Sequence, residues 1–465
     1  MRESFPDLTR LPNAVTPKRY ELKLEVDLVK QCYKGRVNIR IHVQKDTDGT
    51  IWLHSKNLDI SSAYLQVSHF ALPIEAQEII HVPEKSCIGL SFPSQTVKKN
   101  LRAWLLMSFE GRLSQNLEGF FCNPYTDEDG NVQVGAATMF AATEARSCFP
   151  CFDEPHLKAI FAIEVTVDSD LMVISNMPLM DSEAVTSSSS QTRKKRRDIF
   201  EWTKEMSTYL VCIVIGKYDF VQTKAHKTKI RIYTPFAQRE QGRYSLQVAK
   251  KCLEFFNSYF GKNYPLPKLD LVALRRLSVG AMENWGLITC RENALIVDPQ
   301  DASPSTLRRI ATLIAHEISH QWFGNLVTMT FWDCLYLNEG FATFMQYLAI
   351  DSIYPEFEVF NEFSTETFVP ALGMDALENS HAIEVTLKDA SEISQVFDKI
   401  TYCKGASVIY MLHQFVLLFF LSLWFDLTYV CLADSWVRND SKVEFENTFL
   451  ISLTATLALT TCGIF

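Results

Sequence analysis

The amino-acid sequence predicts an α+β fold, in which an antiparallel β domain precedes a mainly helical domain. Two observations support this prediction. The chain has 465 residues, more than one hydrophobic core usually organises, so at least two domains are expected. Apolar and polar residues alternate with a period of two in the first half of the chain, and the period lengthens to that of a helix after Pro235.

The β domain is predicted for residues 1–220. The alternation marks half-buried antiparallel strands, and its apolar positions are Tyr20, Leu22, Leu24, Val26 and Leu28, followed by Val37, Ile39, Ile41 and Val43. Shorter apolar runs follow, for example at 162–167 and 209–215. The polar, basic stretch 187–197 lies between strand-like segments and is interpreted as a solvated hairpin loop. A nuclear-targeting patch is the less favoured alternative.

The helical domain is predicted for residues 221–414. One segment repeats apolar residues at helical spacing, namely Leu246, Ala249, Cys252, Leu253 and Phe256, and a second such segment covers 306–323. The final segment, 415–465, is an apolar tail. Its two apolar runs, 415–433 and 448–465, approach the length of a membrane span. Asp426 and the division into two runs argue against a spanning helix.

Composition excludes several classes of protein. The net charge is −9, so the chain has little with which to neutralise a phosphate backbone, and a nucleic-acid partner is not expected. The first twenty residues contain no apolar signal segment, so a cytoplasmic location is expected. Cys148 and Cys151 form a single CxxC motif, which without a second pair does not predict redox chemistry or a zinc ribbon.

The segment HEISH at 316–320 carries the strongest chemical signal. On a helix, His316 and His320 lie one turn apart on the same face, so both imidazoles can reach one ion. Glu317 lies about 100° round the helix, which suits a general base acting on water. Glu339 follows His320 after eighteen intervening residues, in a second helix-like segment, and is the candidate third ligand. Three ligands and an open position predict a catalytic site for one Zn²⁺ ion.

Amide hydrolysis is the reaction that such a site performs most naturally. Zinc lowers the pKa of its bound water to about 7 and polarises a carbonyl oxygen. Glu317 would take a proton from that water and later give one to the leaving amine. Asp333, six residues before Glu339, is either an acceptor for an imidazole N–H or a simple surface carboxylate.

At this point the sequence resembles the M1 family of zinc aminopeptidases, and most of all its puromycin-sensitive branch. The resemblance spans residues 10–414 and is carried by FPCFDEP (149–155), GAMENWG (280–286), HEISHQWFGNLVTM (316–329), LNEGFA (337–342) and TYCKGAS (401–407). It implies a saddle-like N-terminal β domain and a thermolysin-like catalytic domain. The catalytic domain is expected to be incomplete in this chain, because the relatives continue with further helices and domains where the apolar tail stands.

The resemblance also implies roles for individual residues. Glu283 would bind the free α-amino group of a peptide, which fixes the scissile bond one residue from the N-terminus. Tyr402 would donate a hydrogen bond to the oxyanion of the tetrahedral intermediate. Gly280 and Ala281 would let the backbone approach the substrate closely. The substrate-binding segment implied by the family is Gly280, Ala281, Met282, Glu283 and Asn284.

Three departures from the family pattern accompany the resemblance. Relatives usually carry a glutamine or glutamate pair before FPCFDEP that helps to hold the substrate's amino end, whereas this chain has Met139 and Ala141. Glu144 is nearby but out of register. Cys290 replaces an aromatic residue of the relatives. The tail 415–465 matches nothing in the family and is interpreted as aberrant, divergent sequence rather than as a membrane anchor.

The function predicted from the sequence is therefore that of a zinc-dependent aminopeptidase acting on peptides with a free N-terminus. Two alternatives remain. One is a truncated, weakly active or inactive paralogue that acts as a binding protein, favoured by Ala141 and the missing domains. The other is an endopeptidase with the same zinc chemistry, against which Glu283 argues.

Overall fold

A computed structural model of the chain describes residues 10–67, 72–185, 194–298 and 300–417. The predicted apolar tail from residue 418 onward lies outside the described residues, as do positions 187–193 of the predicted hairpin loop. That loop connects β13 (Leu179–Val185) to β14 (Lys195–Phe200), and the two strands pair antiparallel as expected for a hairpin.

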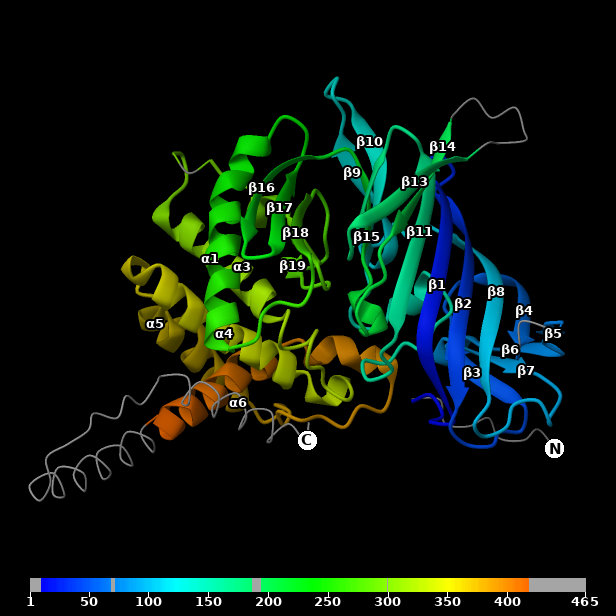
Figure 1. Cartoon of the computed structure of the whole chain (residues 1–465). Helices are drawn as coiled ribbons and strands as arrows, with labels where there is room; N and C mark the ends of the chain where they lie inside the picture. Colours follow the sequence, from blue (N-terminus) through cyan, green and yellow to red (C-terminus); the bar gives the residue numbers. More distant parts are fainter. Residues whose placement is uncertain (1–9, 68–71, 186–193, 299, 418–465) are drawn as a thin grey trace, which may run out of the picture.

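The β domain is built on a sheet of eight strands in the order β13, β14, β11, β1, β2, β8, β4, β5 (Figure 1). Its other strands are β1 (Val15–Asp27), β2 (Cys32–Val43), β4 (Asp59–Gln66), β5 (Ile74–Glu75), β8 (Arg102–Arg112) and β11 (Ile160–Asp168). The predicted alternation is confirmed, because Tyr20, Leu22, Leu24 and Val26 are all buried. One pairing differs from the antiparallel prediction, since β1 and β11 run parallel.

Two smaller sheets complete the β domain. A three-stranded sheet pairs β3 (Thr50–His54), β7 (Cys87–Ser91) and β6 (Glu78–Val82). A four-stranded sheet has the order β12 (Met172–Ser175), β15 (Ile213–Gly216), β10 (Val132–Met139) and β9 (Gly119–Thr126). Met139, one of the departures from the family pattern, is the last residue of β10 and so lies at the end of an inner strand of this sheet.

The second unit begins with a five-stranded sheet that the periodicity of the sequence does not predict. Its order is β16 (Asp219–Ala225), β17 (Thr228–Thr234), β18 (Lys268–Leu274), β20 (Leu287–Arg291) and β19 (Ala281–Met282). The central strand β18 is buried at all seven positions and pairs with parallel neighbours on both sides. A strand buried on both faces shows no alternation, so periodicity could not reveal it.

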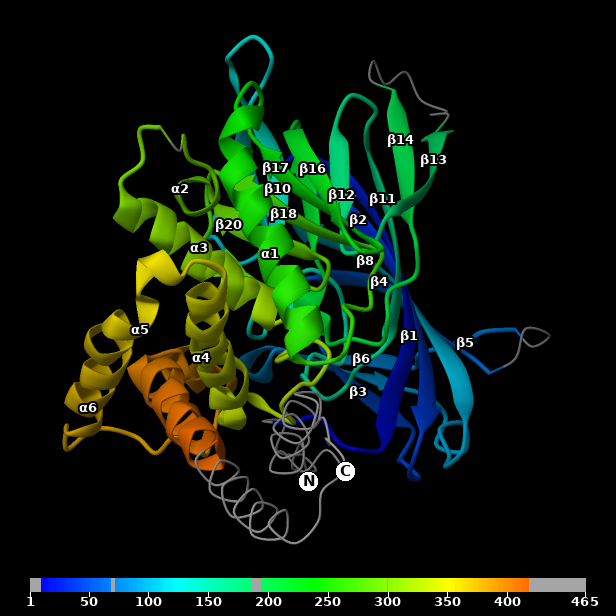
Figure 2. The ribbon, with the colours of Figure 1, turned by 60° about the vertical axis from the view of Figure 1, so that its left-hand side comes forward.

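The first three helices of this unit contact that sheet, and the later ones lie farther from it (Figure 2). The helices are α1 (Arg243–Tyr259), α2 (Glu292–Leu295), α3 (Pro304–Ser319), α4 (Tyr336–Ile353), α5 (Val359–Glu362) and α6 (Val369–Asp375), followed by a helix over 405–417. The five apolar residues predicted on one helix face are all buried in α1. Helix α3 begins where Ser303 accepts a hydrogen bond from the Thr306 N–H, with Pro304 in the first turn.

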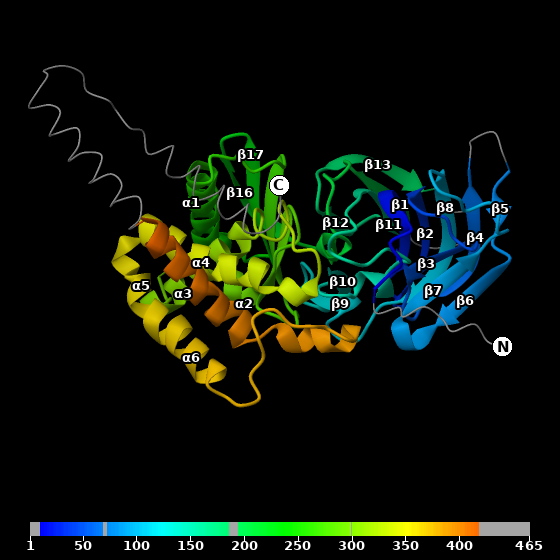
Figure 3. The same ribbon diagram turned by 90° about the horizontal axis from the view of Figure 1, so that it is seen from below.

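Seen from below, the β domain and the helices form two neighbouring halves of the molecule (Figure 3). Within the described part of the chain, no helix is both long and apolar enough to cross a lipid bilayer.

Candidate active site

Helices α3 and α4 bring the three candidate ligands together. His316 lies in the last turn of α3, His320 caps that helix, and Glu339 lies in the first turn of α4. The Nε2 atoms of the two histidines are 3.1 Å apart. Glu339 Oε2 lies 3.4 Å from His316 Nε2 and 3.3 Å from His320 Nε2. Around a tetrahedral zinc with bonds of about 2.0–2.1 Å, ligand atoms are separated by about 3.3–3.4 Å. The spacing therefore fits a single zinc ion.

The outer nitrogens of the imidazoles explain why a cation fits between the inner ones. His320 Nδ1 lies 2.9 Å from the main-chain oxygen of Phe323, and His316 Nδ1 lies 2.8 Å from Gln346 Oε1. Both acceptors require a proton on Nδ1, so in the neutral rings each Nε2 carries a lone pair. Two lone pairs facing each other at 3.1 Å repel one another unless a positive charge lies between them.

These contacts correct one sequence-based interpretation. Asp333 does not accept the imidazole N–H of either ligand, because Gln346 and the Phe323 carbonyl occupy both Nδ1 positions. Gln346 follows Glu339 by seven residues on α4, so both side chains lie on the same helix face. That spacing is the signal by which the sequence could have identified Gln346.

Three buried glutamates surround His320 and favour positive charge at this place. Burial by itself lowers the pKa of His320, but the carboxylates of Glu339, Glu283 and Glu317 raise it to about 10. The pKa of Glu339 is lowered well below its usual range, since the two imidazoles outweigh the effect of its burial. The cluster is thus suited to stabilise a cation.

Glu317 has the properties expected of a general base. Its side chain is buried, and its Oε2 atom makes no hydrogen bond to the described protein. Burial raises the pKa of Glu317 well above its usual range; His320 opposes this shift, and Glu283 and Glu339 reinforce it. A carboxylate with a free oxygen and a raised pKa can accept a proton near neutral pH.

A cavity of about 820 Å³ lies between the two domains at this cluster. Glu283, Glu339 and Tyr402 line it from the second unit, and Met139 and Ala141 line it from the β domain. The substrate-binding segment implied by the family reaches the cavity only in its middle. Ala281, Met282 and Glu283 line it, whereas Gly280 is exposed and Asn284 is buried with its amide 3.5 Å from Thr289 Oγ1; neither is among the lining residues.

Tyr402 lies beside the ligands, with its ring centroid 6.2 Å from that of His316. Burial raises the pKa of Tyr402 well above its usual range, and Glu339, Glu283 and Glu317 raise it further. The phenol therefore keeps its proton and remains a hydrogen-bond donor. Its helix packs closely on α4, because a Cβ on Gly340 would lie only 2.9 Å from the backbone of Gly405.

Asp398, which is not among the residues predicted from the sequence, holds the turn that carries Tyr402. Its Oδ1 accepts hydrogen bonds from the N–H groups of Ile400 (2.9 Å) and Thr401 (3.1 Å), and its main-chain oxygen accepts one from the Tyr402 N–H (3.0 Å). Its Oδ2 lies 2.9 Å from His381 Nε2. Aspartate is a preferred residue at helix N-termini, which was the available signal.

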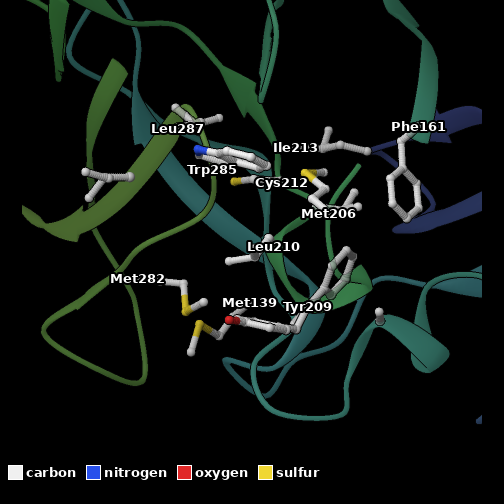
Figure 4. Packing of buried hydrophobic residues seen from close by; sticks show 14 of the residues in the cluster. Met139, Phe161, Met206, Tyr209, Leu210, Cys212, Ile213, Met282, Trp285 and Leu287 are labelled. Carbon is white, nitrogen blue, oxygen red and sulfur yellow. The ribbon is translucent and has the colours of Figure 1, made fainter. Parts of the chain in front are cut away.

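The wall that departs from the family pattern is apolar. Met139 is buried, and Figure 4 shows its side chain and that of Met282 pointing toward one another near Tyr209. Glu144 does not replace the missing carboxylate, because it forms an ion pair of 2.7 Å with Lys56. Cys290 is buried in β20. Burial raises the pKa of its thiol, and the negative charge of the nearby Glu317 raises it further.

The fold and the His–His–Glu cluster define a protein of the metallopeptidase class. Comparison with known families agrees: the Peptidase M1 N-terminal domain matches residues 16–210, and the Peptidase family M1 domain matches residues 244–417. These two matches cover most of the described chain. The chain belongs to peptidase family M1.

Curated relatives are aminopeptidases of about twice the length. Aminopeptidase M1 of Arabidopsis thaliana is 39% identical over 417 residues, which are 89% of this chain and 46% of the relative. Puromycin-sensitive aminopeptidase of Caenorhabditis elegans is 37% identical over 406 residues, which are 87% of this chain and 42% of the relative. Aminopeptidase 2, mitochondrial, of Saccharomyces cerevisiae is 37% identical over 413 residues, 88% of this chain and 42% of the relative. The chain spans less than half the length of these relatives.

Proposed function

We propose that this chain is a zinc-dependent aminopeptidase that removes the N-terminal residue from peptides. The observation that carries the proposal is the tetrahedral spacing of three ligand atoms, one of which belongs to Glu339 in the wall of a cavity that Glu283 and Tyr402 also line. His316, His320 and Glu339 would hold the zinc ion. When bound, zinc supplies a Lewis acid that polarises the scissile carbonyl and acidifies a water molecule.

The remaining chemistry belongs to the side chains of the chain itself. The free Oε2 of Glu317 takes a proton from the attacking water and returns one to the leaving amine, so the base is regenerated in each turnover. Tyr402 stays protonated and donates to the oxygen on which negative charge develops. The Glu283 carboxylate pairs with the α-ammonium of the substrate, which places the first peptide bond at the ligands.

The substrates proposed are peptides with a free N-terminus. The cytoplasmic location remains a prediction from the sequence. A second candidate function, that of a weakly active or inactive binding protein, is favoured by one specific observation: Ala141 and Met139 stand in the cavity wall where relatives usually carry amino-binding groups.

Hydrolysis of an aminoacyl amide with a free amino group, compared with its N-acetylated form, tests the proposal on the zinc-loaded chain. We expect cleavage of the free-amino substrate and little of the blocked one. Preference for the blocked substrate would sink the exopeptidase assignment in favour of an endopeptidase. Cleavage of neither, by protein that holds zinc, would support the inactive binding protein.

A further inference from the structure

The main-chain oxygen of Glu283 is held by two side chains of the segment that follows α3. Glu283 comes directly after β19, whose last paired residue is Met282. Its carbonyl oxygen accepts hydrogen bonds from Gln321 Nε2 (3.0 Å) and from Asn325 Nδ2 (2.8 Å). A carbonyl oxygen has two lone pairs, so these two amides use its whole accepting capacity.

Gln321 also joins Glu283 to the helix of the general base. Its Nε2 is 3.2 Å from the main-chain oxygen of Glu317, and its Oε1 accepts a hydrogen bond from the Gly286 N–H (3.3 Å). Two carbonyls need a donor and one N–H needs an acceptor, so only one orientation of the amide satisfies all three contacts. A single side chain thus links α3 to both ends of the turn 283–286.

Asn325 makes the corresponding link to a candidate metal ligand. Its own N–H donates to the main-chain oxygen of His320 (3.1 Å), while its side chain holds Glu283. Gly324 has φ +120°, a conformation that favours glycine, and it allows the chain to turn between the end of α3 and Asn325. Gln321 and Asn325 are both fully buried, so water does not compete for these hydrogen bonds.

The turn 283–286 has other supports that do not involve α3. Asn176 of the β domain donates to the main-chain oxygen of Trp285 (2.9 Å), and the buried Lys268 ammonium donates to that of Gly286 (2.9 Å). The turn should therefore stay folded when Gln321 or Asn325 is replaced. What these replacements remove is the fixed placement of Glu283 relative to α3.

We propose that Gln321 and Asn325 are positioning residues that set the distance between the amino-binding carboxylate and the metal ligands. This inference rests on the proposed function. The peptide's amino group is anchored at Glu283 and its scissile carbonyl at the ligands, so this distance decides that one residue is removed. A displacement of about 1 Å can cost on the order of 100-fold in rate, and both amides act on the atom that holds the Glu283 backbone in place.

The test measures binding and needs no turnover. The probes are an aminoacyl hydroxamate, which engages both the zinc and the amino anchor, and its analogue without the amino group, which engages the zinc alone. Calorimetry on the full, zinc-loaded chain gives the ratio of their two affinities. We expect Gln321→Met and Asn325→Leu each to lower this ratio by about 10-fold, and the double variant by more. Zinc content and the affinity for the analogue should stay unchanged.

A matched control separates positioning from general destabilisation. Asn257 is a buried amide in α1 that accepts a hydrogen bond from the Tyr264 N–H (2.6 Å). Asn257→Leu should lower thermal stability and leave the affinity ratio unchanged. Asn325→Leu removes the other donor to the same Glu283 oxygen, so it serves if Gln321→Met fails to fold; the ratio should fall in it as well.

An unchanged ratio in variants that retain zinc, or an equal fall in the Asn257→Leu control, would overturn the inference. Absence of any preference for the amino-bearing probe in the unaltered chain would instead refute the role of Glu283. In that case the proposed function fails first and the positioning role falls with it. The two failures are distinguished by the unaltered chain. Failure of the role of Glu283 is seen there, whereas failure of the positioning role is seen only in the variants.

Discussion

The two sides of the cavity are held in different ways. On the metal side, His316, His320 and Glu339 project from two packed helices, and their separation follows from helical geometry. On the substrate side, Glu283 and Tyr402 come from distant segments and are placed by hydrogen bonds from side chains to the backbone. The spacing of the candidate ligands therefore follows from the packing of two helices, whereas the placement of Glu283 and Tyr402 follows from individual hydrogen bonds.

Replacement of Glu317, the proposed general base, should have the largest effect. Glu317→Gln keeps the shape of the side chain and removes its ability to accept a proton. We expect the rate of peptide hydrolysis to fall by about 10³–10⁴-fold, with the zinc content unchanged because Glu317 is not a ligand. Steady-state kinetics and metal analysis measure the two quantities. Activity close to that of the unaltered chain would show that another group is the base.

Tyr402→Phe should have the next largest effect on the rate of hydrolysis. It removes one hydroxyl donor and leaves the ring beside His316. We expect kcat to fall by about 10²–10³-fold while KM changes little, since the donor is needed chiefly when negative charge develops. A fall in substrate affinity with unchanged kcat would place Tyr402 in ground-state binding instead.

Asp398 tests whether the substrate side depends on hydrogen bonds to the backbone. Asp398→Ala removes the acceptor for the Ile400 and Thr401 N–H groups, an interaction of about 1 kcal/mol at a helix N-terminus. We expect kcat to fall several-fold, because the turn that carries Tyr402 loses two of its hydrogen bonds and Tyr402 is held less firmly. Asp398→Asn keeps an acceptor oxygen and should restore most of the rate. Equal loss in both variants would point to the contact with His381 as the decisive one.

The smallest effect expected is an improvement in KM for substrates with a free amino group. Ala141→Glu introduces a carboxylate into the cavity wall where relatives usually carry an amino-binding group. A second negative charge near Glu283 should lower KM for free-amino substrates by a few-fold and leave hydrolysis of N-acetylated substrates unchanged. The matched variant Ala141→Gln tests the charge separately from the size of the side chain. Equal effects on free and blocked substrates would contradict the assignment of this wall to the amino end.

The sequence predicted these two sides unequally, for physical reasons. Spacing on a helix specifies which side chains share a face, so His316 and His320 could be paired from the sequence alone. Glu339 lies on another helix and was a candidate because it follows in a second helix-like segment. Gln321 and Asn325 act on the main-chain oxygen of Glu283, which is distant in sequence, and no periodicity marks them. Asp398 acts on nearby N–H groups, and the preference for aspartate at helix N-termini was its only signal. The strand β18 was missed for a related reason, because complete burial removes the alternation by which strands are recognised.

Metal analysis of the purified chain tests the central claim most directly. We expect about one zinc ion per chain, and its loss in His320→Ala, which removes one of the three proposed ligands. Circular dichroism on the same samples would show that both proteins are folded. A folded, unaltered chain that binds no zinc when the ion is supplied in excess would contradict the account.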